Sequence, residues 1–409
     1  MAMKTNRILT FALSVLAAML MVSCEADLKM PTSGDMMESD GDFASPESPD
    51  GSDDSEGGSG NTQAGIVTAG EWNDLDNWGF WNDLMSGQNE GKFYEYLNYW
   101  SLYPSNRFAV TVVDADNNPV CGAKVQLYVN DSEQPSWTTI SDNRGSAELW
   151  YRIFTSVDID EERTFTASVN GVKLSEPLAP TNSFAQQVNM NILVAEQVAV
   201  RNSADVAFIV DATGSMGDEI SFLKDDLLNI IQRASSSTSR ELRTAALFYR
   251  DEGDEYVTKH QDFTNDAEKT LKFIKQQNAS GGGDYPEAVH TALEKALQNL
   301  SWGEGNYARL AFLLLDAPPH YQTQVIESLR NSIEAYAANG IKIIPIAASG
   351  VDKNTEFCLR LMAIFTDGTY TFITNHSGVG NDHIIPTVGE YQVEQLNDLI
   401  VRLIEQYTK

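Results

Sequence analysis

Cysteine is scarce in this sequence, with Cys24, Cys121 and Cys358 the only three in 409 residues. Such an odd and scattered set excludes a framework of disulfides, and we expect Cys121 and Cys358 to be buried as small apolar side chains. Basic residues are also scarce, because 28 lysines and arginines face 58 acids and leave a net charge of −30. Each phosphate contact needs a lysine or arginine, so this composition excludes a nucleic-acid-binding protein.

The motifs of several enzyme and metal-binding classes are missing too. There is no His-Glu-x-x-His, no Gly-x-Ser-x-Gly and no P-loop, since the stretch 87–92 has the wrong spacing and lacks the serine or threonine. Asp114, Asp116 and Asn118 have the first half of an EF-hand spacing, but Pro119 stands where that loop needs glycine. We expect a hairpin turn there.

The first residues have the pattern of an export signal. Lys4 and Arg7 precede an apolar run over residues 8–22, which is short for a membrane span. The run Leu-Met-Val-Ser-Cys that ends at Cys24 resembles a bacterial lipobox, and this resemblance implies cleavage before Cys24 and its lipidation, as in palmitate-bearing lipoproteins. We therefore predict a signal peptide over residues 1–23. An ordinary signal peptide with an incidental Cys24 is the alternative.

An acidic stretch follows the expected lipidation site. Residues 25–64 hold eleven acids against one base and are rich in serine, glycine and proline. They cannot bury enough apolar surface to offset their ordering entropy, so we predict a disordered tether over residues 24–64. Its acidic start resembles the export signal of surface-displayed lipoproteins of the Bacteroidota. That resemblance implies an outer-membrane lipoprotein of the cell envelope, and leaves open whether it faces the surface or the periplasm.

Residues 65–107 form an aromatic-rich segment. Glu71-Trp72-Asn73-Asp74 and Trp81-Asn82-Asp83 could each begin a short helix. The aromatic rings could form a platform that stacks on sugars, but tryptophan is highly buried on average, so we favour packing against the next domain. Four of the seven tryptophans lie here: Trp72, Trp78, Trp81 and Trp100.

The hydrophobic period changes to two over residues 108–198, where several short alternating runs are separated by turn sequences. This pattern predicts an all-β sandwich. The run from Val112 to Val125, with the later Ser-Asp-Asn-Arg-Gly-Ser-Ala at 141–147, resembles the carboxypeptidase regulatory-like domain, a small module of Ig-like sandwich type. The resemblance implies a fold and says little about function.

Over residues 203–409 the sequence alternates between strand and helix patterns, which predicts an α/β doubly wound, Rossmann-like sheet. Ligands of such sheets bind beyond the carboxyl ends of the strands. Three polar clusters follow or lie near such ends: residues 211–215, residues 281–284 and Asp316. Their donors are oxygens without histidine or cysteine, which favours a hard cation such as Mg²⁺ over zinc.

These clusters resemble the metal-ion-dependent adhesion site of the von Willebrand factor A (VWA) family, whose motif is Asp-x-Ser-x-Ser, a distal threonine and a distal aspartate. The resemblance implies a VWA domain over residues 203–409, with Asp284 at the threonine position as a departure. The runs Asp-Tyr-Pro-Glu at 284–287 and Asp-Ala-Pro-Pro-His at 316–320 look like a branch that includes domains attached to some alpha-kinases. The implied ligands of a divalent cation are Asp211, Thr213, Ser215, Asp284 and Asp316.

The resemblance implies a binding protein rather than an enzyme. The expected cation is Mg²⁺, with Mn²⁺ or Ca²⁺ as alternatives, and it would bind an acidic side chain of a protein or a cell-surface ligand. The lipid anchor would be the only membrane contact. A rival hypothesis is a metal-assisted hydrolase with His320 as general base and Arg250 or Asp251 as helpers. A scaffold with a vestigial metal site is the third possibility.

Overall fold

The computed structural model describes residues 67–87, 93–130, 132–155, 163–181, 190–283, 285–375 and 383–409. The chain divides into two compact units, Met1–Gly60 and Asn61–Lys409, and every described residue belongs to the second. The expected signal peptide, Cys24, the tether over 24–64 and the candidate ligand Asp284 lie outside the described residues. None of the helices in the described part is long and apolar enough to cross a membrane.

Eight strands form one mixed sheet. They are β1 (Thr68–Trp72), β9 (Arg201–Asp211), β10 (Glu241–Tyr249), β11 (Thr258–Thr264), β12 (Asn306–Leu315), β13 (Lys342–Ala347), β14 (Tyr370–Ile373) and β15 (Glu394–Gln395). Their order across the sheet is β11-β10-β9-β12-β13-β14-β1-β15. The five strands from β10 through β9, β12 and β13 to β14 run parallel. The outer strands β11, β1 and β15 are antiparallel to their neighbours.

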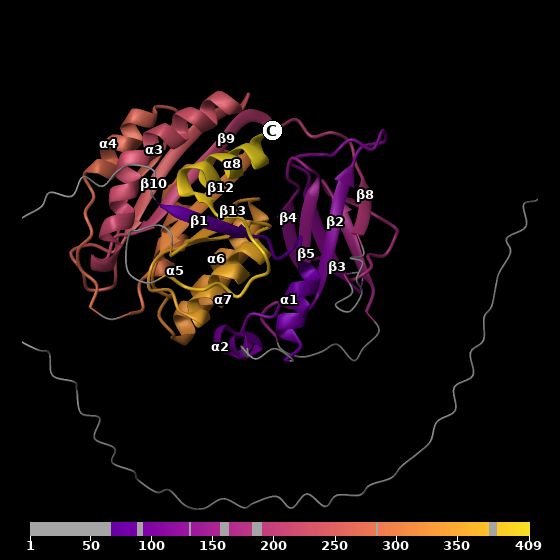
Figure 1. The fold of residues 1–409 in the computed structure, drawn as a ribbon. Coiled ribbons are helices and arrows are strands. Elements are labelled where there is room, and N and C mark those ends of the chain that lie inside the picture. The colour runs from indigo at the N-terminus through magenta and orange to yellow at the C-terminus, as the bar shows by residue number, and fades with distance from the viewer. Residues whose placement is uncertain are drawn as a thin grey trace, which may run out of the picture. The chain divides into compact units, whose positions relative to one another are not determined.

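Helices cover both faces of this sheet, as a doubly wound fold requires (Figure 1). Alternate residues of β9 enter two different cores, because successive side chains of a strand point to opposite faces. One core contains α3 (Gly217–Ser237), α4 (Ala267–Lys275) and α8 (Leu396–Thr408). The other contains α5 (Val289–Asn299), α6 (Thr323–Ala338) and α7 (Lys353–Phe365). The predicted α/β sheet is therefore confirmed.

Seven further strands form two smaller sheets. They are β2 (Arg107–Val113), β3 (Lys124–Val129), β4 (Trp137–Ile140), β5 (Ser146–Trp150), β6 (Phe165–Val169), β7 (Val172–Lys173) and β8 (Met190–Val194), ordered β5-β2-β8 and β4-β3-β6-β7. The Ig-like class of this region stays a prediction. The expected hairpin turn at Asp114 is present, because its carboxylate accepts hydrogen bonds from the backbone N–H groups of Asp116 and Asn118.

The aromatic-rich segment contributes β1 to the mixed sheet, between β14 and β15. The predicted helix start at Glu71-Trp72 is therefore wrong, because both residues pair with β14 as a strand. After β1 come α1 (Trp78–Met85), the short 3-10 helix η1 (Phe93–Glu95) and α2 (Tyr96–Trp100). The predicted packing of the tryptophans is confirmed: Trp72, Trp78, Trp81 and Trp100 are all buried.

Helix α7 is the element against which this segment packs. The ring of Trp81 stacks on Phe357 with 5.9 Å between centroids, and Nε1 of Trp100 donates to Oδ1 of Asn354 at 2.9 Å. Arg360 of α7 forms a buried bidentate ion pair with Asp74, at 2.9 and 2.5 Å. The α/β domain is thus completed by a segment that precedes it by more than a hundred residues.

The two cysteines differ from each other. Cys358 is fully buried on α7, as expected. Cys121 is only partly buried, so that prediction is wrong for this residue. Its thiol lies 3.5 Å from the carbonyl oxygen of Tyr307, which gives the sulfur a polar neighbour that a purely apolar site would lack.

Candidate metal centre

Two strand ends bring Asp211 and Asp316 to one edge of the sheet. Asp211 is the last residue of β9, and Asp316 follows the last residue of β12. The strands are paired in parallel, with Leu314 opposite Val210, so their carboxyl ends lie side by side. We call the described loop residues at this edge, residues 211–216, 250–254, 281–283, 285–287 and 316–320, the rim.

The loop after β9 is fixed by its own aspartate. Oδ1 of Asp211 accepts two hydrogen bonds from Thr213, from the backbone N–H at 2.9 Å and from the hydroxyl at 2.7 Å. Oδ2 of Asp211 is buried and has no hydrogen-bond partner among the described residues. The chain then enters the short 3-10 helix η2 (Gly214–Met216), where Ser215 is exposed.

The carboxylates of the rim are crowded and unneutralised. Oδ1 of Asp316 is a second buried oxygen that lacks a hydrogen-bond partner in the described part of the chain. Burial raises the pKa of Asp211 to about 7, and the charge of Asp316 acts in the same direction. Burial also raises the pKa of Asp316, against the opposing effect of the Ser215 hydrogen bond. These shifts show that the folded protein holds both acids where a negative charge is unfavourable.

Glu287 is a third rim carboxylate, and the sequence motif did not reveal it. Its backbone N–H donates to the carbonyl of Pro318 at 2.9 Å, which holds Glu287 against the loop after β12. This pairing keeps the chain extended here, and α5 begins at Val289. The side chain is buried, and its Oε2 has no partner among the described residues. Burial raises its pKa to about 9, with Asp211 the next contributor.

The glycine-rich loop lies directly against the loop after β9. The backbone N–H of Gly214 donates to the carbonyl of Gly281 at 3.1 Å. Gly281 has a φ of 83° and faces the carboxylate of Asp254, which would lie 2.5 Å from any added Cβ. Glycine is therefore required at this position for two independent reasons. The same Asp254 carboxylate accepts a hydrogen bond from the backbone N–H of Gly282 at 2.9 Å, which ties the two rim loops together.

A histidine and an aspartate form a pair within the rim. Nε2 of His320 lies 2.6 Å from Oδ1 of Asp251, and both side chains are largely buried. Arg250, the other expected helper, donates to the carbonyl oxygens of Ala212 and Asn278. Arg250 therefore connects the loops that contain Ala212 and Asn278, while Asp251 orients the imidazole of His320.

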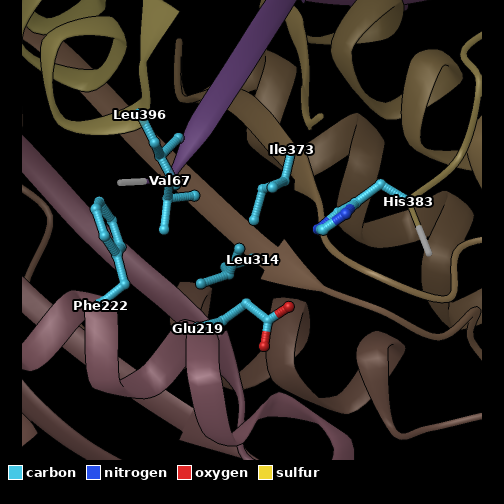
Figure 2. Close-up of a pocket in the computed structure, with 7 residues that line it drawn as sticks. All are labelled: Val67, Glu219, Phe222, Leu314, Ile373, His383 and Leu396. Atoms are coloured by element: carbon cyan, nitrogen blue, oxygen red, sulfur yellow. The ribbon is translucent and has the colours of Figure 1, made fainter. Parts of the chain in front are cut away.

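A small cavity of about 10 Å³ lies beneath the rim. It is lined mainly by apolar side chains, among them Val67, Leu314 and Leu396 (Figure 2). Its polar lining comes from Glu219 and His383, which Figure 2 shows on the side away from Phe222. Oε1 of Glu219 accepts a hydrogen bond from Ser349 at 3.1 Å, and burial, with a smaller effect of Asp316, raises its pKa. A volume of this size has room for about one water molecule.

The donor set fits a hard cation. Asp211, Thr213, Ser215 and Asp316 supply only oxygen, and two buried carboxylate oxygens among them have no other partner. Within the described ranges, no group of three or more His, Cys, Asp or Glu side chains is placed to hold a metal by itself.

Sequence motifs thus located four of the five predicted ligands at one edge, while Glu219 and Glu287 were missed. A local signal existed for each. Glu219 falls in the first turn of α3, four residues after Ser215, and Glu287 follows Pro286, a residue type common at the first position of a helix. Both positions are ordinary for an acid at a helix N-terminus, so nothing in the sequence distinguished them from capping residues.

Residues 205–367 match the family model of the von Willebrand factor A domain, and this part of the chain is a VWA domain. The curated proteins that the chain resembles include a putative ariadne-like RING finger protein of Acanthamoeba polyphaga mimivirus, 32% identical over 129 residues. They also include the alpha-protein kinase vwkA of Dictyostelium discoideum, 25% identical over 169 residues, and the von Willebrand factor A domain-containing protein 7 of Rattus norvegicus, 26% identical over 136 residues.

These matches are partial on both sides. They cover 32%, 40% and 33% of this chain and 12%, 26% and 14% of the respective relatives. The chain therefore spans about a quarter or less of the length of the curated relatives it matches. A solved structure, the conserved hypothetical protein BatB from Bacteroides thetaiotaomicron, is 14% identical, with a TM-score of 0.35 over 50% of this chain and 98% of that one.

Proposed function

We propose that this protein is a cell-envelope lipoprotein, anchored through Cys24, that binds a protein or cell-surface ligand through a divalent cation in its VWA domain. The lipid is its only contact with the membrane. Mg²⁺ is the first candidate, with Mn²⁺ and Ca²⁺ as alternatives, because all donors are oxygens. The proposed ligands of the cation are Asp211, Thr213, Ser215, Asp284 and Asp316.

The observation that carries the proposal is the pair of unpartnered oxygens, Oδ2 of Asp211 and Oδ1 of Asp316. A buried carboxylate without a partner is costly, and protein interiors rarely contain one without a reason. A divalent cation between the two strand ends would satisfy both oxygens and reverse the local charge. It would also leave coordination positions open for a group from a partner, since Mg²⁺ usually retains several water ligands.

The likeness to other proteins supports the binding part of the proposal. The matched segment is a VWA domain, and the relatives that share it differ widely in the rest of their chains. A domain found in such different contexts is suited to holding a partner. In this protein the open cation position would take an acidic side chain of that partner.

The test is a capture experiment with the immobilised mature protein and an outer-membrane preparation. We expect a partner to be retained in Mg²⁺ and released by chelator, and Asp316→Ala to abolish the retention. Asp398 lies on α8 and pairs with Arg233 of α3, and both side chains are partly exposed. Asp398→Ala removes one carboxylate from this pair and serves as the matched control. Capture that is equal in Mg²⁺ and in chelator would contradict the proposal.

One observation favours a second candidate, a metal-assisted hydrolase. The 2.6 Å contact between His320 and Asp251 is the arrangement that orients a histidine as a general base. Such an enzyme would lose hydrolysis of a model ester on His320→Ala while it kept Mg²⁺ binding. Retained partner capture by His320→Ala, with no hydrolysis by the wild type, would favour the binding function. A protein that bound neither Mg²⁺ nor a partner would be the scaffold with a vestigial site.

A further inference from the structure

Exposed tyrosines gather next to the rim. Tyr99, Tyr285 and Tyr321 are 36%, 44% and 50% exposed, and they are three of the four exposed large aromatic side chains in the described part of the chain. They come from different elements: α2 of the aromatic-rich segment, the loop before α5, and the loop after β12. We call them the tyrosine platform.

Two of the three rings contact each other, and the third is held by hydrogen bonds to the loop before α7. The ring of Tyr321 stacks on that of Tyr99, with centroids 3.8 Å apart and an interplanar angle of 24°. The hydroxyl of Tyr285 donates to the carbonyl of Gly350 at 3.1 Å and accepts the backbone N–H of Asp352 at 3.2 Å. The ring of Tyr99 contacts that of Trp100 with 5.2 Å between centroids, and Trp100 donates to Asn354 of α7. Tyr285 and Tyr99 are therefore both tied to the first residues of α7 and its N-cap.

The platform depends on the docking of the aromatic-rich segment. Helix α2 lies beside α7, whose N-cap is Asp352 (Figure 1). The hydrogen bond from Trp100 to Asn354 fixes α2 at that place, and Trp100 also contacts Tyr321 edge-on at 6.2 Å. Tyr99 is therefore held in position beside a VWA loop by packing on both sides.

The charge of this surface indicates the chemistry of its partner. The acids that face or adjoin it include Asp352, Asp316 and Asp251. Two bases on neighbouring elements are already bonded within the chain: Lys353 to Glu356 at 2.8 Å, and Arg330 to the carbonyl of Ser101 at 2.9 Å. Tyrosine rings surrounded by carboxylates attract guanidinium and ammonium groups through the negative face of the ring. The protein uses this contact itself, with the guanidinium of Arg240 3.5 Å from the ring centroid of Tyr307.

We propose that the partner held at the cation also lies across Tyr285, Tyr321 and Tyr99, and that it is a polypeptide that presents arginine or lysine side chains to these rings. The inference rests on the proposed binding function. It adds a second recognition surface, built jointly by the VWA domain and the segment that precedes the β-domain. Aromatic side chains held rigidly at a surface are the groups that contribute most to protein interfaces, because they bury a large area at little entropic cost.

The test uses the full mature protein in Mg²⁺ at low ionic strength and a fluorescent peptide of alternating glycine and arginine. We expect this peptide to bind, and Tyr99→Ala and Tyr321→Ala each to weaken it by about tenfold, in the range of a cation–π contact. Tyr321→Phe should bind as the wild type does, because the ring is retained. Tyr321→Lys, which keeps the position exposed and repels the peptide, should weaken binding more than Tyr321→Ala does.

Two results would overturn the inference. One is equal binding of the arginine peptide by the wild type and both alanine variants, which would show only general attraction to an acidic protein. The other is a ring-dependent preference for a peptide of alternating glycine and glutamate, or for a neutral oligosaccharide. Calorimetry with Mg²⁺ alone separates this inference from the proposed function. Tyr321→Ala should bind Mg²⁺ as the wild type does, whereas a wild type that bound no Mg²⁺ would refute the cation site independently of the peptide result.

Discussion

Buried carboxylates occur in two settings in this protein, and the difference between them locates the candidate site. Away from the rim, three buried carboxylates are each paired with an arginine: Asp74 with Arg360, Glu148 with Arg107, and Asp205 with Arg243, all at 2.5 to 2.7 Å. At the rim, oxygens of Asp211, Asp316 and Glu287 are buried with no hydrogen-bond partner among the described residues. The chain has twice as many acids as bases, and none of the ion pairs among its described residues includes Asp211, Asp316 or Glu287.

This contrast separates a structural acid from a functional one. A paired buried acid loses stability when its base is removed, because the charge is left uncompensated. An acid that binds a cation is already uncompensated when the cation is absent, so the metal-free protein already contains the unfavourable free energy of its buried charge. Substitutions in the two settings should therefore change the free energy of unfolding in opposite directions when no cation is present, and the predictions below use that difference.

The largest effect is expected at the paired acid. Arg360→Ala leaves Asp74 buried without its partner and also removes the guanidinium that lies over the rings of Trp81 and Phe93. We expect a loss of about 3–5 kcal/mol in the free energy of unfolding, measured with urea. The double variant with Asp74→Ala should recover part of the loss. A change near zero for Arg360→Ala would show that the docking of the aromatic-rich segment does not depend on this pair.

An effect of the opposite sign is expected at the rim. Burial raises the folded-state pKa of Asp211 from its ordinary value of 3.8 to about 7. The folded protein therefore loses stability as pH rises from about 4 to 7 and this carboxyl ionises. Asp211→Asn in chelator at pH 8 should therefore stabilise the protein by about 1–2 kcal/mol. The same variant should gain nothing from added Mg²⁺. A clear destabilisation in chelator would mean that the carboxylate is structural.

Asp284 tests the departure from the family pattern. A third carboxylate near the cation neutralises more of its charge, so we expect tighter cation binding and a weaker attraction for an acidic partner than a threonine would give. Asp284→Thr should lower the Mg²⁺ affinity by about tenfold, measured by calorimetry, since one tenfold step is about 1.4 kcal/mol. An affinity equal to or higher than that of the wild type would refute this role.

The smallest effect is expected where a pair is open to solvent. Arg233 and Asp398 are 2.7 Å apart, with side chains 41% and 44% exposed. Arg233→Ala should change the free energy of unfolding by less than about 1 kcal/mol, because solvent screens such pairs. A loss of stability as large as that of Arg360→Ala would contradict the comparison, because burial would then not determine how much an ion pair contributes.

The fold and the site were predictable where the signal is local. The loop 211–215 follows its strand directly, and Asp316 does the same, so a strand pattern and a short motif place both at one edge. Strand β1 was not predictable, because Thr68–Trp72 pairs with residues about three hundred positions away. Gly70 further weakens its strand pattern. It is required because the rings of Phe372 and Tyr391 lie where its Cβ would be.

Glu287 shows the other limit. Its burial depends on a backbone hydrogen bond to Pro318, which forms only after the loops before α5 and after β12 have met. A sequence pattern predicts helices, strands and helix ends, but it does not predict which two loops will form hydrogen bonds with each other. The same holds for Tyr99, whose place beside Tyr321 follows from the docking of α2 on α7.

The most direct test of the central claim is a calorimetric titration of the wild type and Asp316→Ala with Mg²⁺ in chelator-treated protein. The account predicts one bound cation in the wild type and at least a tenfold loss of affinity in Asp316→Ala, with about 2.7 kcal/mol of added stability in the wild type at a hundredfold excess over the dissociation constant. Absence of Mg²⁺, Mn²⁺ and Ca²⁺ binding by the wild type, or equal affinity in the variant, would contradict it.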